Sequence, residues 1–286
     1  MKMRLQDLSP LIVIGMHRSG TRLIAQILER LGIFMGSDQQ ADAESIGFML
    51  ANEGLLHQCG AFWSEPMSAH FLLAEPSNVS AMAQALQGTL DDVFSQYVGQ
   101  AQWHEALTDS AQAGFGWKDP RNTFTLPVWQ AIFPSARVIH VIRHGVDVAA
   151  SLARRHSEAM CKSSATDWPS ALTVIRESAL GVLSSRRGWS IAEAFTMWEQ
   201  YTEKARLETA ALGDRTIEVR FEDVLSSPLA AVERIANFCG VGLESNELAW
   251  TGKFSSDRAF AFRGDKTLVE FASSRQAALS HFGYDV

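Results

Sequence analysis

A glycine loop between a buried strand and an amphipathic helix constrains the fold of this chain more than any other segment, and it lies in LIVIGMHRSGTRLIAQILERLG. The apolar run Leu11–Ile14 predicts a strand that is buried on both faces. Gly15 and Gly20 allow a tight backbone turn, and the apolar spacing over Thr21–Leu31 predicts a helix. Because such a turn directs backbone N–H groups and a helix N-terminus at one point, the segment predicts an anion-binding site.

The side chains of this loop favour phosphate or sulfate as the anion. Arg18 carries a planar charged group that matches phosphate and sulfate oxygens, and Ser19 and Thr21 add hydroxyl donors. Arg22 stands where a loop that cleaves nucleoside triphosphates has the hydroxyl that holds Mg²⁺, so the loop is poorly suited to that reaction. The residues predicted to bind the anion are His17, Arg18, Ser19, Gly20, Thr21 and Arg22. The alternative is an ordinary strand, turn and helix with surface charges.

A second segment, VIHVIRHGVDVAASL, repeats the order of strand, polar turn and helix. Arg143 follows a buried strand, and Ser151 lies in the first turns of the next helix. Since the carboxyl edge of a parallel sheet is where α/β proteins bind ligands, Arg143 and Ser151 are predicted to hold one phosphate together. Asp147 would repel a phosphate, and near a helix N-terminus it is interpreted as structural.

Strands and helices alternate along the rest of the chain. Further strands are predicted at Phe115–Trp117, Arg137–Ile142 and Thr216–Phe221, and further helices at Phe48–Leu56, Val79–Val98, Val146–Arg155, from Ser190 to Gly213, at Pro228–Phe238 and at Lys266–His281. This alternation predicts an α/β chain with a P-loop-like three-layer fold, in which helices flank a central, mostly parallel sheet. We expect residues 1–286 to form a single domain.

Composition excludes several classes of protein. The net charge of −7 argues against a nonspecific nucleic-acid binder, which needs an excess of Lys and Arg. The three cysteines are far apart and have no metal-ligand spacing, so reduced thiols and no metal site are expected. No apolar run is long enough for a membrane span, and no signal peptide is recognised. We therefore expect a cytoplasmic protein.

Several segments resemble one known family. GMHRSGTR resembles the 5′-phosphosulfate loop of sulfotransferases that use 3′-phosphoadenosine 5′-phosphosulfate (PAPS), especially bacterial members and tyrosylprotein sulfotransferases. VIHVIRHGVDVAASL resembles the 3′-phosphate motif of the same family, and GWKDPR, VRFEDVLSSP and the terminal SHFGY are also similar to it. The resemblance is weakest over residues 37–114 and 154–190, two insertions expected to shape the acceptor pocket.

The resemblance implies roles for residues outside the two motifs. Lys118 would contact the transferring sulfate or the bridging oxygen, and a surface ion pair is the alternative for this residue. Phe221 would lie near the adenine. Arg263 and Gly264 would cover the 3′-phosphate, and Arg22 replaces the Thr or Ser that is usual in the loop. PAPS would be the donor, 3′,5′-ADP the product, and no metal would be required.

The general base is the part of the mechanism that the sequence leaves open. The family's small-molecule enzymes have a His two residues after the corresponding Lys, where this chain has Pro120. Tyrosylprotein sulfotransferases have a Glu some twenty residues beyond the loop Arg, and the acids in that region are ranked Glu44, then Glu53, then Asp38. A solvated loop carboxylate is the alternative for each.

Two further functions remain open at this point. One is a kinase with a diverged phosphate loop, and the other is a noncatalytic nucleotide-binding protein of the same fold. The acceptor is not identified: a carbohydrate, a lipid, a polyketide and a peptide all remain, and the oligomeric state is undetermined. Large aromatic residues could line an acceptor pocket or belong to the core, namely Phe62, Trp63, Trp103 and Trp168.

Overall fold

A four-stranded parallel sheet runs through the centre of the molecule in the order β2-β1-β3-β4. The computed structural model describes residues 5–110, 114–162, 186–243, 250, 252 and 254–286. The strands are β1 (Leu11–Ile14), β2 (Gly116–Lys118), β3 (Arg137–Ile142) and β4 (Thr216–Arg220). Because every pair is parallel, the four carboxyl ends meet at one edge of the sheet.

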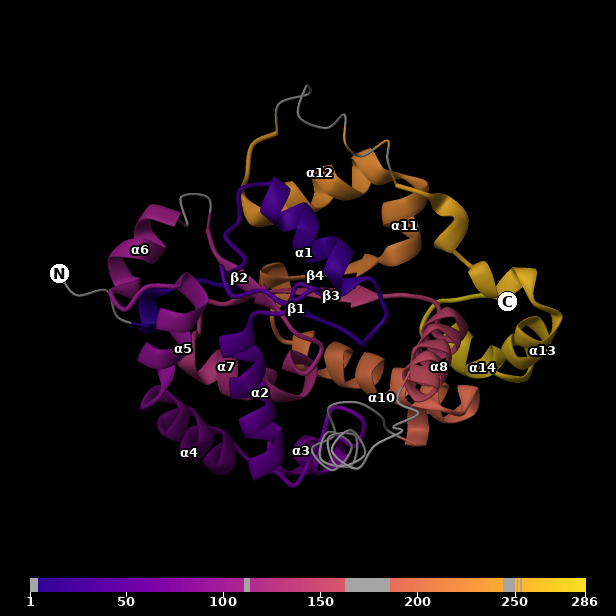
Figure 1. Cartoon of the computed structure of the whole chain (residues 1–286), viewed down its shortest axis with the longest axis horizontal. Helices are drawn as coiled ribbons and strands as arrows, with labels where there is room; N and C mark the ends of the chain where they lie inside the picture. Colours follow the sequence, from indigo (N-terminus) through magenta and orange to yellow (C-terminus); the bar gives the residue numbers. More distant parts are fainter. Residues whose placement is uncertain (1–4, 111–113, 163–185, 244–249, 251, 253) are drawn as a thin grey trace.

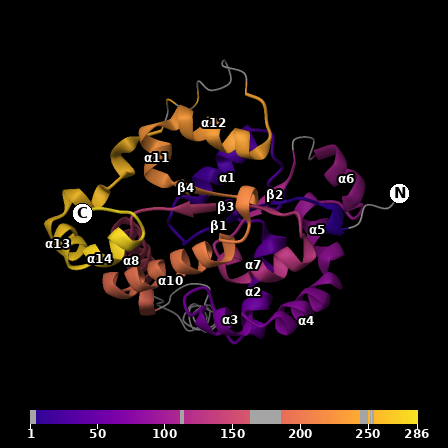
Figure 2. The same ribbon diagram turned by 180° about the vertical axis from the view of Figure 1, so that it is seen from behind.

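Helices cover both faces of the sheet and make three layers (Figure 1; Figure 2 from behind). One face carries α1 (Thr21–Arg30), α11 (Phe221–Ser226) and α12 (Pro228–Cys239). The other carries α2 (Ile46–Gln58), α3 (Met67–Leu72), α4 (Pro76–Gln87), α5 (Leu90–Val98), α7 (Asn122–Ile132) and α10 (Ile191–Thr209). Helices α8 (Gly145–Lys162), α13 (Lys266–Ser274) and α14 (Gln276–His281) lie toward the carboxyl edge, and α6 (Trp103–Ser110) lies near the other end.

The core is divided by the sheet into two hydrophobic clusters. Along β1, Ile12 and Ile14 belong to one cluster, whereas Leu11 and Val13 belong to the other. Successive side chains of a strand point to opposite faces, so a continuous apolar run is required where both faces are covered by helices. This burial holds β1 in the middle of the sheet and fixes the place of the glycine loop that follows it.

The predicted α/β three-layer fold is confirmed, and two helix predictions are wrong. Val79–Val98 is two helices, α4 and α5, with a break at Gly88 and Thr89. Lys266–His281 is also two helices, because the chain leaves helical geometry at Arg275. The sequence analysis did not predict α7, which contains Pro127 in its interior. A proline has no N–H to donate in the interior of a helix, so a proline in the sequence predicts the end of a helix.

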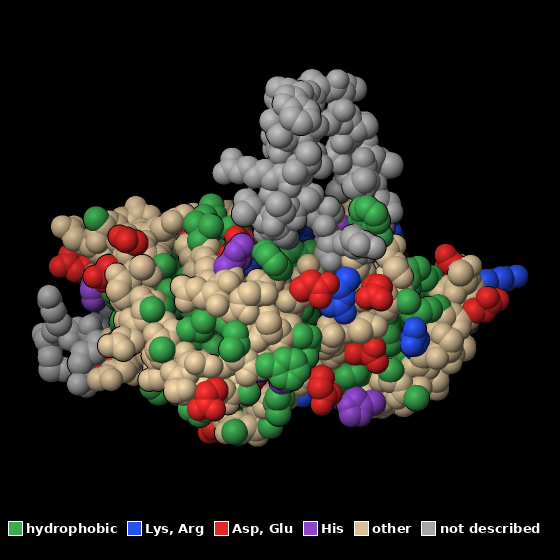
Figure 3. Space-filling view, turned by 90° about the horizontal axis from the view of Figure 1, so that it is seen from below, with side chains coloured by type: hydrophobic (Ala, Val, Ile, Leu, Met, Phe, Trp, Pro, Cys, Tyr) green, Lys and Arg blue, Asp and Glu red, His purple; other side chains and the backbone are tan. Residues whose placement is uncertain are grey.

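The face of the molecule seen in Figure 3 agrees with the acidic composition. On the face seen in Figure 3, more acidic than basic side chains are visible, with hydrophobic side chains scattered among them. Across the described ranges, no helix is both long enough and apolar enough to cross a membrane. The predicted insertion 37–114 contains α2 to α6, whereas most of the insertion 154–190, including Trp168, lies outside the described residues.

Candidate functional site

A cavity of about 440 Å³ opens at the carboxyl edge of the sheet. The loop after β1, the end of β2 and the turn after β3 all contribute to its wall. The predicted site residues in the wall are His17, Arg18, Gly20, Thr21, Arg22, Glu44, Lys118, Arg143 and Phe221. The parallel sheet therefore gathers residues as far apart in the sequence as His17 and Phe221.

The loop after β1 depends on its two glycines. Gly15 has a φ of +133°, and a Cβ there would lie 2.3 Å from the carbonyl oxygen of Val141. Gly20 has a φ of +96°, and a Cβ there would lie 2.2 Å from the ring of Phe221. Arg18 also has a positive φ, of 71°. The loop therefore packs tightly against β3 and the start of α11, in a backbone shape that L side chains rarely adopt.

The two predicted anion motifs contact each other directly. Arg18 donates from Nε to Ser151 Oγ over 3.0 Å, and Arg143 donates from Nη1 to the backbone oxygen of Arg18 over 3.3 Å. The guanidinium of Arg143 also lies over the ring of Phe221, 4.7 Å from its centroid. Arg18 thus joins Ser151, which does not line the cavity, to Arg143, which lies on Phe221.

Asp147 has the structural role that its sequence position predicted. Its carboxylate pairs with Arg143 Nη2 at 3.2 Å and accepts hydrogen bonds from the backbone N–H groups of Ala261 and Phe262. Arg143 Nη2 also donates to the backbone oxygen of Arg258 over 2.8 Å. These bonds orient the guanidinium and join the C-terminal segment to the turn after β3.

Positive charge dominates the cavity. Its cationic side chains are Arg18, Arg22, Lys118, Arg143, Arg155 and Arg258, whereas its acids are Asp42 and Glu44. Burial lowers the pKa of Arg18, and so do the neighbouring charges of Arg155 and Arg258. Within the described ranges, the buried Oγ of Ser19 and Nε of Arg143 have no hydrogen-bond partner. The excess of cations over acids and the free donors together fit a ligand with several anionic oxygens.

A buried ion cluster closes one side of this cavity. Lys118 Nζ lies 3.0 Å from Glu44 Oε1, and Arg121 Nη1 lies 3.1 Å from Glu44 Oε2. Arg121 also pairs with Asp119 at 2.9 Å and with Glu53 at 3.1 Å. Burial raises the pKa of Glu44, but Lys118 and Arg121 outweigh it and lower that pKa to about 2. Glu44 is therefore an ionised carboxylate with both oxygens occupied.

The family model that matches this chain is that of the sulfotransferase family, and it covers residues 10–245. The chain belongs to the sulfotransferase family. It is similar in structure to the sulfotransferase domain from the curacin biosynthetic pathway, at 17% identity over 99% of this chain and 100% of that one, with a TM-score of 0.54.

Two other solved sulfotransferases are also similar to this family member. The sulfotransferase domain of the Synechococcus olefin synthase has 17% identity over 94% of this chain and 86% of that one, with a TM-score of 0.48. A Mycobacterium avium sulfotransferase has 13% identity over 99% of this chain and 79% of that one, also with a TM-score of 0.48. No curated protein matches the chain.

Some predicted site residues of this sulfotransferase lie outside the cavity wall. Glu53 reaches Arg121 rather than the cavity. Asp38 accepts hydrogen bonds from Ser45 Oγ and the backbone N–H of Gly47, so it organises the start of α2. Arg263 lies over the ring of Phe260, 4.5 Å from its centroid, and neither it nor the exposed Gly264 lines the cavity.

Two arginines in the wall were not among the predicted site residues. Arg258 occupies the C-terminal side of the cavity, where Arg263 was expected. Arg155 follows Ser151 by four positions on α8, and this spacing places both on one helix face. The helical spacing from Ser151 is the signal that could have found Arg155, whereas nothing in the sequence singled out Arg258 from its basic neighbours.

The aromatic residues expected in an acceptor pocket are distributed differently. Trp63 lies edge-on to His17, with ring centroids 4.9 Å apart, so it is next to the cavity. Phe62 lies edge-on to His57, and Trp103 stacks on Phe94 within the core. Among these three, Trp63 is the one that contacts a residue of the cavity wall.

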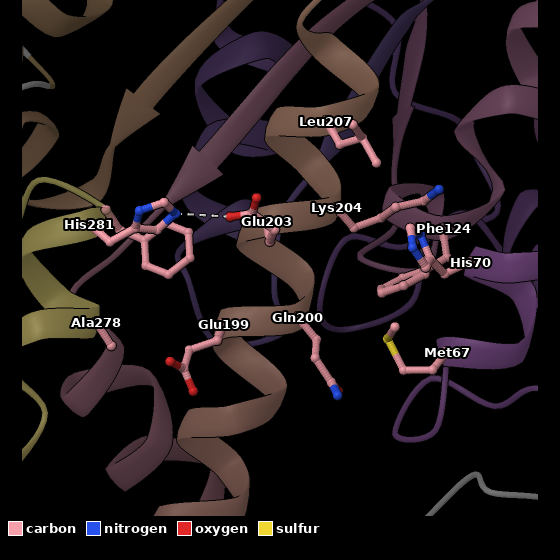
Figure 4. Close-up of a pocket in the computed structure, with 11 residues that line it drawn as sticks. Met67, His70, Phe124, Glu199, Gln200, Glu203, Lys204, Leu207, Ala278 and His281 are labelled. Atoms are coloured by element: carbon pink, nitrogen blue, oxygen red, sulfur yellow. Dashed lines mark hydrogen bonds and ion pairs between the residues drawn. The ribbon is translucent and has the colours of Figure 1, made fainter. Parts of the chain in front are cut away.

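A second cavity, of about 450 Å³, lies on the outer side of α10 (Figure 4). Helix α10 contributes Glu199, Gln200, Glu203, Lys204 and Leu207, while α3 and α14 form its sides. His281 pairs with Glu203 at 3.1 Å. The glycine loop and the turn after β3 contribute nothing to its wall, so this second cavity is separate from the cationic one.

Proposed function

We propose that this protein transfers a sulfuryl group from PAPS to an acceptor hydroxyl or amine and releases 3′,5′-ADP. The observation that carries the proposal is the direct contact between the loop after β1 and the turn after β3 inside one cationic cavity. PAPS carries a phosphosulfate and a separate 3′-phosphate. Arg18, Ser19 and the loop N–H groups suit the first group, and Arg143 with Ser151 suits the second.

The same residues support the chemical step. As the bond between sulfur and the bridging oxygen breaks, negative charge builds on the 5′-phosphate of the leaving nucleotide. Cations and N–H groups that are already in place lower the barrier most, because they need no reorganisation when that charge appears. Arg18 and Lys118, which line the same cavity, are assigned this role.

Glu44 fits the orientation of Lys118 better than the removal of a proton. Lys118 and Arg121 stabilise the carboxylate of Glu44 and lower its pKa to about 2. Its oxygens are already occupied by Lys118 and Arg121. We therefore assign Glu44 a positioning role, in which it holds the ammonium of Lys118 at the cavity wall.

Ligand-dependent stability tests the proposal without knowledge of the acceptor. A ligand that binds only the folded state raises the melting temperature, and the stabilisation grows with the logarithm of the ligand concentration relative to its Kd. We expect 3′,5′-ADP to stabilise the protein without Mg²⁺ and to do so more than 5′-AMP. Stabilisation by Mg-ATP in preference to 3′,5′-ADP would support the kinase instead.

Transfer itself is tested by incubation of the protein with labelled PAPS and a panel of alcohols, phenols, amines, sugars and peptides. We expect formation of 3′,5′-ADP together with a labelled acceptor. Tight binding of 3′,5′-ADP without transfer to any acceptor or to water would identify a noncatalytic member of the family.

A further inference from the structure

His17 lies in the wall of the cationic cavity, and within the described residues its ring nitrogen Nε2 has no hydrogen-bond partner. The residue precedes Arg18 in the loop, and its ring lines the cavity. The ring lies edge-on to Trp63, at 4.9 Å between centroids, and to Tyr201, at 6.3 Å. In the part of the chain that the structure describes, its Nε2 is a buried atom with no partner. A buried polar atom without a partner is rare in a folded protein and marks a place where a ligand or a reaction supplies one.

Its surroundings keep the imidazole neutral. Burial lowers the pKa of His17 well below its usual value, and the positive charges of Arg121, Arg155 and Lys118 add to this effect. The carboxylate of Glu44 acts in the opposite direction but does not outweigh them. A neutral imidazole has one nitrogen with a free lone pair, which can accept a proton.

Three ionisable groups near His17, namely Glu44, Tyr201 and Lys118, are already occupied. Both oxygens of Glu44 pair with cations. The hydroxyl of Tyr201 donates to the backbone oxygen of Trp63 over 2.6 Å, and burial raises the pKa of this tyrosine. Lys118 is held by Glu44. Among these described neighbours, His17 is the group with a free proton-accepting atom.

We propose that His17 is the general base that removes the proton from the acceptor. This inference rests on the proposed function. The acceptor oxygen or nitrogen forms a bond to the sulfur of PAPS, and its proton moves to the free ring nitrogen of His17. The bond between that sulfur and the bridging oxygen breaks, and its electron pair stays on the 5′-phosphate of 3′,5′-ADP. His17 then returns the proton to solvent.

This role places His17 on the acceptor side of the transferring group, not among the nucleotide ligands. Arg18 and Ser19, the next two residues, supply charge and hydroxyl to the anion, whereas the ring of His17 contacts the aromatic rings of Trp63 and Tyr201. Substitution of a residue that accepts a proton and substitution of a residue that binds the nucleotide have different kinetic effects. Loss of the base lowers kcat, whereas loss of a nucleotide ligand weakens binding of 3′,5′-ADP.

His156 provides a matched control. Its ring stacks on Trp63 with centroids 6.1 Å apart and planes 5° apart, and within the described residues neither of its nitrogens has a partner. Unlike His17, it does not line the cavity. His17→Asn and His156→Asn therefore remove the same chemical group from two neighbours of one tryptophan.

The experiment compares these variants with the unaltered protein, using PAPS as donor and water, phenol or 4-nitrophenol as acceptor. Phenol keeps its proton at mildly alkaline pH, whereas 4-nitrophenol is largely ionised and has no proton to lose. We expect His17→Asn to lower kcat with water and phenol by about 100-fold or more, and with 4-nitrophenolate by less than about fivefold. The affinity for 3′,5′-ADP should change by less than about threefold, and His156→Asn should keep the unaltered kcat.

The pH profile provides an independent test. A base must be neutral to act, so kcat/KM of the unaltered protein should fall as the pH decreases through the lowered pKa of His17, which lies below 6.5. His17→Asn should lack this acidic limb. Added imidazole should restore activity to His17→Ala but not to Glu44→Gln.

Three results would overturn the inference: an unchanged kcat with phenol in folded His17→Asn, an equal loss with phenol and 4-nitrophenolate, or a tenfold weaker binding of 3′,5′-ADP. Failure of the proposed function would look different, because the unaltered protein would then convert PAPS with none of the three acceptors. That result would remove both proposals, whereas failure of the inference alone appears only in the variants.

Discussion

Glu44 Oε1 lies 3.0 Å from Lys118 Nζ, and both side chains are buried, with exposed fractions of 5% and 2%. The pair joins the segment before α2 to the end of β2. A lysine at a buried strand end is costly without a partner, and Glu44 supplies that partner at the wall of the cationic cavity. The pair therefore keeps a mobile side chain in one place beside the predicted position of the transferring group.

Substitution Glu44→Gln should lower kcat by about 100-fold or more, because Lys118 loses the charge that orients it. The affinity for 3′,5′-ADP should change much less, since Arg18 and Arg143 remain in place. Steady-state kinetics with PAPS and direct titration with 3′,5′-ADP measure the two effects separately. Because Glu44 acts through Lys118, the loss should be the same for phenol and for 4-nitrophenolate.

Two controls distinguish this positioning role from general misfolding. Glu53→Gln removes a carboxylate that pairs with Arg121 outside the cavity wall, and it should leave kcat close to that of the unaltered protein. Glu44→Asp keeps the charge and should recover part of the lost rate. A normal turnover rate in Glu44→Gln would contradict the role assigned to Glu44.

Substitution Arg143→Ala should weaken binding of 3′,5′-ADP by about 10-fold to 100-fold, since a hydrogen-bonded charge pair contributes roughly 1.5–3 kcal/mol. Binding of 5′-AMP, which lacks the 3′-phosphate, should change by less than about threefold. Calorimetric titration with both nucleotides measures the difference. Arg263→Ala, outside the cavity wall, is the control and should bind both nucleotides normally. An equal loss for the two nucleotides in Arg143→Ala would show that this arginine does not recognise the 3′-phosphate.

Substitution Gly20→Ala should weaken binding of 3′,5′-ADP at least tenfold and destabilise the fold by roughly 1–3 kcal/mol. The new Cβ would lie 2.2 Å from Phe221, so that ring or the loop has to move. Gly60→Ala is a matched control, because Gly60 also has a positive φ, of +63°. A Cβ added there would have no neighbouring atom within 4 Å. If both variants bind 3′,5′-ADP equally well, the contact between Gly20 and Phe221 is not needed for the site.

Acid should destabilise the protein partly through Glu44. Its pKa is lowered from 4.5 to about 2 in the fold, so its contribution is fully present above pH 4.5 and is lost as the pH falls toward 2. The contribution is on the order of 3 kcal/mol. Urea unfolding at several pH values should show a smaller gap between the unaltered protein and Glu44→Gln at the acidic end. A gap that stays constant between pH 5 and the acid transition would contradict the lowered pKa.

The local sequence was sufficient to predict the strands of the sheet and most of the glycine loop. The runs at Leu11–Ile14 and Arg137–Ile142 gave the strands with their observed bounds, because strands buried on both faces need continuous apolar residues. The helix α7 was missed. Most of its residues are buried, so it shows no polar face, and Pro127 in its interior obscures the helical pattern. The breaks at Gly88 and Arg275 were missed for the opposite reason, because helical apolar spacing continues across both.

The sequence by itself determined the fold class, the glycine loop and the family, because these depend on short-range patterns of apolar, glycine and basic residues. Only the tertiary structure decided which charges meet. Glu44 and Lys118 are 74 positions apart, and Arg18 and Ser151 are 133 apart. Their contacts depend on the parallel order β2-β1-β3, which brings separate strand ends to one edge. The loss of a free proton-accepting atom on Glu44, and its presence on His17, follow from that arrangement.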